Sequence, residues 1–163
     1  MTLTEAVNEL AEVQGRIHVQ EENDHRFPDA GPESGADPES DASGAIAELF
    51  DDYLAGFNDF DAGQIADCFS QPAVIWQHDK GHVFKDDEEL LENIEALLSA
   101  LKNEGVTYSE FHVSSSHVSG STALVTLDWR QENGDGEAIL EFTCHYHLRQ
   151  DGDDWTIALV INE

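Results

Sequence analysis

Residues 122–149 read TALVTLDWRQENGDGEAILEFTCHYHLR, two runs of alternating apolar and polar residues on either side of an Asn-Gly-Asp-Gly segment. Alternation with a period of two is typical of strands that bury one face, and a short Gly-containing connection indicates a hairpin. If Asp135-Gly136 forms a two-residue turn, one register accounts for both faces. It pairs Val125 with Tyr146, Leu127 with Cys144 and Trp129 with Phe142 on the inner face, and Arg130 with Glu141 on the outer face. The last of these is a favourable cross-strand charge pair.

The alternation continues on both sides of this hairpin. We expect four strands, near 106–118, 122–132, 137–149 and 154–162, with Gly-containing turn signals between them. Connections this short require an antiparallel meander.

Ahead of the meander the spacing of apolar residues becomes helical, over 46–57 and again within 86–104. Asp86 and Glu89 have the spacing of a capping box, and Gly105 stands where a C-cap belongs. We therefore predict two amphipathic helices in these segments.

A shorter helix and two short strands are predicted between them. Asp61 and Gln64 indicate the start of the helix, and Pro72 indicates its end. Strands are expected at 73–78 and 82–84. Three helices covering one face of a curved antiparallel sheet make an α+β domain.

The first part of the chain, residues 1–43, has a different composition. Apolar residues repeat at helical spacing over 3–18, which predicts an amphipathic helix. Residues 20–43 are acidic and contain three prolines and several glycines, which predicts a disordered linker. The folded domain is therefore expected to span 44–163.

Acidic residues dominate the whole sequence. The 163 residues include 35 acids and 7 bases, a formal net charge of −28, and no stretch is basic. Nucleic acids and anionic membranes bind clustered Lys and Arg, so neither is an expected partner. Acids scattered over tail and domain alike suit a protein adapted to molar salt, where charge repulsion is screened.

The N-terminal residues lack the basic and apolar regions of a signal peptide, and no apolar run is long enough to span a bilayer. Cys68 and Cys144 lie far apart and are interpreted as small buried residues rather than as a disulfide or metal motif. These features predict a cytoplasmic protein.

Three patterns within 44–162 resemble the nuclear transport factor 2-like superfamily, which includes SnoaL-like cyclases and ketosteroid isomerases. They are Tyr53-x-x-x-Phe57-Asn58-x-Phe60-Asp61, the helix at 86–104 set before the meander, and Ala123–Trp129 followed by Gly152-x-x-Trp155-x-Ile157. The resemblance implies a curved sheet wrapped around helices, a cone with a pocket at its open end. It also implies a homodimer packed through the sheet. Isomerases, dehydratases, cyclases and non-enzymatic binding domains share this fold, so the fold alone does not decide the function.

In enzymes of that superfamily an Asp, or a His–Asp pair, projects from the sheet into the cone. Here Asp128, His145 and His147 fall on the outer face, and the inner faces are almost wholly apolar, which disfavours catalysis. Two histidines without a third ligand do not make a metal site, so no metal and no cofactor are expected.

The best catalytic candidates are His78 and Tyr53, as proton carrier and oxyanion donor. We expect Tyr53, Phe57, Trp76 and Trp129 to line an aromatic ligand pocket beside His78. The alternative is a surface histidine next to the 79–81 turn, with Trp76 in the core.

Three functions stay open at this point. The first is binding of a small apolar ligand. The second is a cofactor-free isomerase, cyclase or dehydratase, and the third is a protein-interaction domain. The expected homodimer would use the outer sheet face, which includes Thr126, Arg130, Glu141, Thr143 and His145.

Overall fold

The computed structural model describes residues 38–77 and 79–163. The predicted helix at 3–18, most of the predicted linker and His78 lie outside the described residues. The elements, in chain order, are α2 (Pro38–Asn58), α3 (Ala62–Ala66), β1 (Phe69–Gln77), β2 (Lys80–Phe84), α4 (Asp87–Asn103), β3 (Tyr108–Ser119), β4 (Thr122–Glu132), β5 (Ala138–Asp151) and β6 (Asp154–Asn162).

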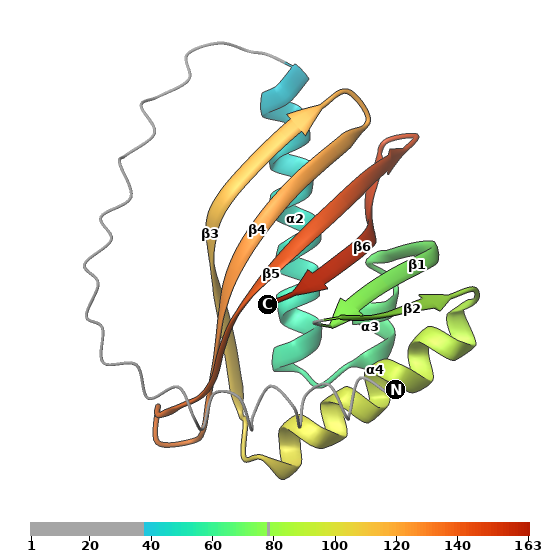
Figure 1. Cartoon of the computed structure of the whole chain (residues 1–163). Coiled ribbons are helices and arrows are strands. Elements are labelled where there is room, and N and C mark those ends of the chain that lie inside the picture. The colour runs from blue at the N-terminus through green and yellow to red at the C-terminus, as the bar shows by residue number, and fades with distance from the viewer. Residues whose placement is uncertain (1–37, 78) are drawn as a thin grey trace.

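The strands form one curved sheet with the order β2-β1-β6-β5-β4-β3 (Figure 1). The predicted antiparallel meander from β3 to β6 is confirmed. The sheet as a whole is mixed rather than antiparallel, because β1 lies parallel to β6. A strand that precedes α4 in the chain thus joins the far side of the meander, next to its last strand.

The predicted register of the central hairpin is confirmed at all four pairs, from Val125 with Tyr146 to Arg130 with Glu141. The two-residue turn is wrong. Glu132 pairs with Ala138, and the register shifts between Gln131 and Glu132. The side-chain oxygen of Asn133 accepts hydrogen bonds from the N–H groups of Asp135 and Glu137, both at 3.0 Å. These local bonds stabilise a loop longer than predicted. The register shift beside this loop leaves the predicted pairing in the rest of the hairpin unchanged.

Three helix ends follow the predicted capping signals. Asp86 accepts a hydrogen bond from the Glu89 N–H at 2.9 Å at the start of α4, and Gly105 follows its end with φ of +86°. Asp61 accepts one from Gln64 at the start of α3. Pro72 does not end this helix: it lies inside β1, at an irregularity in the pairing with β6.

The first helix is longer than predicted. It begins at Pro38 rather than near Gly44, so the last part of the predicted linker is helical. Figure 1 shows this helix running along one face of the curved sheet, with α4 crossing the lower end. Phe50 of α2 contacts Tyr146 of β5 edge to face, at 5.1 Å between ring centroids. The core therefore lies between the helices and the inner sheet face, and its lower end holds the site described next.

No helix in the described part of the chain is long and apolar enough to span a membrane.

Candidate ligand-binding cavity

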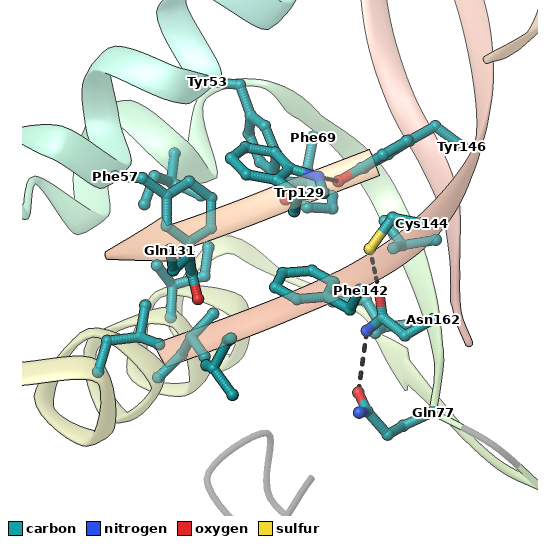
Figure 2. Close-up of a pocket in the computed structure, with 17 residues that line it drawn as sticks. Tyr53, Phe57, Phe69, Gln77, Trp129, Gln131, Phe142, Cys144, Tyr146 and Asn162 are labelled. Carbon is teal, nitrogen blue, oxygen red and sulfur yellow. Dashed lines mark hydrogen bonds between the residues drawn. The ribbon is translucent and has the colours of Figure 1, made fainter. Parts of the chain in front are cut away.

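A cavity of about 70 Å³ lies between the helices and the inner face of the sheet (Figure 2). Its walls come from α2, α3 and α4 on one side and from β1, β4, β5 and β6 on the other. Ile94, Leu97 and Leu101 of α4 supply an aliphatic wall, because they recur at helical spacing on its buried face. The cavity therefore occupies the end of the cone that α4 crosses.

Three of the aromatic residues predicted for the pocket do converge there. Tyr53 and Phe57 stand one turn apart on α2, and each contacts Trp129 of β4. The ring centroids of Phe57 and Trp129 are 5.4 Å apart, and those of Tyr53 and Trp129 are 5.8 Å apart. Tilted and edge-to-face contacts of this kind hold the rings in place and leave a rigid apolar wall.

Trp76 does not join this group, contrary to the predicted convergence. On β1 the residues Ala73, Ile75 and Gln77 are buried, whereas Trp76 is 41% exposed and does not line the cavity. Its ring lies against the backbone of Gly81 on β2, where a Cβ atom would stand 2.6 Å from it. The predicted inner face of this strand was therefore the wrong one. His78 lies outside the described residues.

The polar side chains of the cavity form two groups of hydrogen bonds. The Trp129 indole N–H donates to the Tyr146 hydroxyl at 3.0 Å. The Cys144 thiol donates to the side-chain oxygen of Asn162, whose amide nitrogen donates to the oxygen of Gln77 at 2.9 Å. Figure 2 shows the second group of contacts as a line across β5, β6 and β1. These bonds satisfy most of the polar atoms that the cone buries.

Among the described residues that line the cavity, Gln131 is the exception, whereas the Trp155 indole nitrogen is buried without a partner outside it. Its side chain is 2% exposed, and its amide nitrogen donates to the Ser109 hydroxyl at 3.3 Å. Its oxygen, Oε1, is buried and has no hydrogen-bond partner. Figure 2 shows this oxygen directed toward the space beside Phe142. The cavity thus contains a preformed acceptor.

Burial keeps the titratable groups of the cavity neutral. Desolvation is the main cause that raises the pKa of the Tyr53 and Tyr146 hydroxyls, and it raises the pKa of the Cys144 thiol to about 12. The described residues that line the cavity include no carboxylate, imidazole, Lys or Arg. The described part of the site therefore has an uncharged surface and no side chain that could accept a proton as a general base near neutral pH.

The outer sheet face carries the residues predicted for it. The Thr126 hydroxyl lies 2.9 Å from Nδ1 of His145, whose Nε2 lies 3.1 Å from a carboxylate oxygen of Glu163. The Thr143 hydroxyl donates to Asp128 at 2.7 Å. Arg130 contacts Glu141 at 2.8 Å, as its predicted pairing requires. None of these groups reaches the cavity, because they point away from the face that Val125, Leu127 and Trp129 bury.

The amide side chains of the cavity were missed in the sequence, although one of them had a signal. Gln131 stands two residues after Trp129 in β4, so the same alternation places it on the inner face. Gln77 and Asn162 had no comparable signal. They meet as register partners across the parallel β1–β6 pair, which no local pattern predicts.

Comparisons with known proteins agree with this fold. Residues 40–163 match the model of a family described as NTF2-like protein (DUF6841). None of the curated proteins is similar in sequence to the chain. Among solved structures, an NTF2-like protein of unknown function from Shewanella oneidensis has a TM-score of 0.59 at 15% identity, covering 74% of this chain and 98% of that one. A proposed dehydratase of the NTF2-like family from Streptomyces avermitilis has a TM-score of 0.58 at 14% identity, covering 77% and 96%. A protein of unknown function from Mycobacterium tuberculosis has a TM-score of 0.61 at 16% identity, covering 79% and 77%. At these identities the structures share the fold.

Proposed function

Because the chain belongs to the NTF2-like family (DUF6841), we propose that its domain binds a small, largely apolar ligand in the cavity of the cone. The observation that carries this proposal is the cavity itself, lined by rigid aromatic and aliphatic side chains. An empty space in a protein interior lacks the van der Waals contacts that close packing would supply. An apolar cavity that the fold nevertheless contains therefore supports a ligand-binding role.

The size of the cavity limits the ligand. A water-sized group needs about 10–15 Å³ of such space, so 70 Å³ suits a ligand with only a handful of non-hydrogen atoms in the enclosed part. Pockets for drug-sized molecules are larger, about 300–1,000 Å³. A single substituted ring is the largest rigid unit that we expect to enter.

The test is binding of toluene, followed by calorimetry and by the rise in the unfolding midpoint that a ligand of the native state causes. Leu140, 2% exposed, lines the cavity, and Leu140→Phe fills part of it. Leu124, 56% exposed, is the matched control, because Leu124→Phe adds the same atoms outside the cavity. We expect toluene to bind the wild type and Leu124→Phe, but not Leu140→Phe. Absence of toluene binding to the wild type would contradict the proposal.

An enzyme is the alternative, a cofactor-free isomerase, cyclase or dehydratase that uses His78 and Tyr53. It needs a general base near the bound ligand. The hydroxyls and thiol of the cavity are poor bases, because burial raises their pKa and holds them protonated. The alternative therefore depends on His78. If the ligand retained from native cells is converted by the wild type and not by His78→Ala, the binding-only proposal is wrong.

The outer sheet face favours a second proposal, a homodimer. Trp76 of β1 and its register partner Ile161 of β6 are exposed on this face. Val83 of β2 and Leu124 of β4 are also exposed there, in the adjacent line of register partners across the sheet. Exposed apolar side chains on one face are typical of an interaction surface. A second copy of the chain is the proposed occupant, as the superfamily resemblance implies, and the oligomeric state in solution tests it.

A further inference from the structure

We infer that the ligand of the cavity is uncharged and carries a hydrogen-bond donor, a hydroxyl or neutral N–H group, that binds Oε1 of Gln131. This inference rests on the proposed function and specifies the chemistry of its ligand. The rest of the ligand is apolar, to match the aromatic and aliphatic walls.

The acceptor is the first reason. A buried polar atom without a partner costs about as much as its lost hydration, and native proteins keep few of them. Oε1 of Gln131 is such an atom, and Gln131 is one of the residues that line the cavity. With its nitrogen donating to the Ser109 hydroxyl, the amide directs Oε1 toward the space beside Phe142 (Figure 2). A donor from a ligand would supply the missing bond.

The position of Gln131 is fixed from both sides, which makes it a recognition group rather than a mobile side chain. Gln131 pairs with Ser109 of β3 and with Leu140 of β5. Ser109 is itself held to α2, because its N–H donates to the side-chain oxygen of Asn58 at 2.7 Å and its carbonyl oxygen accepts from the Asn58 amide at 3.0 Å. The oxygen therefore meets a ligand in a set place.

The absence of charge in the described lining is the second reason. An anion would meet the carbonyl-type oxygen of Gln131 with no Lys or Arg nearby, in a protein of net charge −28. A cation would lose its hydration without gaining a carboxylate partner. Both ions are disfavoured, and a neutral donor is the remaining match.

Phenol and toluene are the probes, because they share a ring and differ in one donor group. Gln131→Met keeps the volume of the side chain and removes the acceptor. Gln150→Met is the control, because it makes the same substitution at a residue that does not line the cavity. Dissociation constants are measured by calorimetry for both probes with the wild type and both variants, in one buffer at neutral pH. Anisole, whose oxygen carries no hydrogen, serves as a second probe without a donor.

We expect Gln131→Met to weaken phenol binding about 10-fold, as loss of one buried neutral hydrogen bond implies, and to change toluene and anisole binding less than about 3-fold. Gln150→Met should leave the phenol-to-toluene ratio near that of the wild type. If phenol and toluene are affected equally by Gln131→Met, the inference is wrong while the cavity proposal stands. The inference is also wrong if benzoate or benzylammonium binds more tightly than phenol. If neither phenol nor toluene binds the wild type, the proposed function itself fails.

Discussion

Replacing Tyr146 with phenylalanine tests whether the hydrogen bond between Trp129 and Tyr146 stabilises the cone. Tyr146 is 2% exposed, and its hydroxyl accepts the hydrogen bond of the buried Trp129 indole N–H at 3.0 Å. Without the hydroxyl this donor has no partner in the apolar core, which costs about 1–3 kcal/mol of the free energy of unfolding. For a domain of this size that loss lowers the unfolding midpoint by roughly 4–12 °C.

The assay is thermal and urea unfolding of the wild type, Tyr146→Phe and the matched control Tyr108→Phe. Tyr108 is 47% exposed, so loss of its hydroxyl should change the free energy of unfolding by less than about 0.5 kcal/mol. A cycle with Trp129→Phe isolates the coupling between the two partners, expected at about 1 kcal/mol. Equal effects at positions 146 and 108, or a coupling energy near zero, would refute the reasoning.

Three further predictions concern pH, salt and assembly. The Cys144 thiol has an ordinary pKa of 9.0 and a folded-state pKa of about 12, raised chiefly by burial, so between these pH values the unfolded state loses a proton that the native state keeps. The free energy of unfolding should therefore fall as pH rises through this range. Measured by urea unfolding at several pH values, its decrease should be smaller in Cys144→Ala by up to about 1.4 kcal/mol per pH unit; the same pH dependence in the variant and the wild type would contradict the buried thiol. The unfolding midpoint should rise from dilute buffer to molar KCl, because salt screens the repulsion among acidic side chains, and a flat or falling midpoint would argue against salt adaptation. Sedimentation in high salt should show a dimer that Trp76→Glu weakens, whereas a wild type that stays monomeric at high concentration rules out the proposed interface.

The central hairpin shows which structural features the local sequence pattern can predict. Its alternation predicted which residues of β4 and β5 face inward, and the observed pairing of Leu127 with Cys144 agrees. The predicted two-residue turn between them was wrong, because Asn133 makes local hydrogen bonds that favour a longer loop. The predicted pairing of the two strands was nevertheless correct. Burial of one face constrains register more strongly than turn chemistry does, because a one-residue slip would expose the whole apolar set.

The cavity was predicted in part for the same reason. Tyr53, Phe57 and Trp129 lie on strongly periodic elements, so their inward faces could be derived. Trp76 lies in a run of β1 where apolar residues occupy both faces, so alternation could not show which face is buried.

What the sequence determined by itself is the α+β class, the meander with its inner face, and the helix caps, because each depends on residues close together in the chain. What only the tertiary structure decided is the side of β1 that faces the cavity, and with it the chemistry of the site. That choice depends on the parallel pairing of β1 with β6, which sets Gln77 beside Asn162, 85 residues further along the chain. No local pattern encodes such a pairing, because it is stabilised only when the whole sheet closes around α2 and buries both strands.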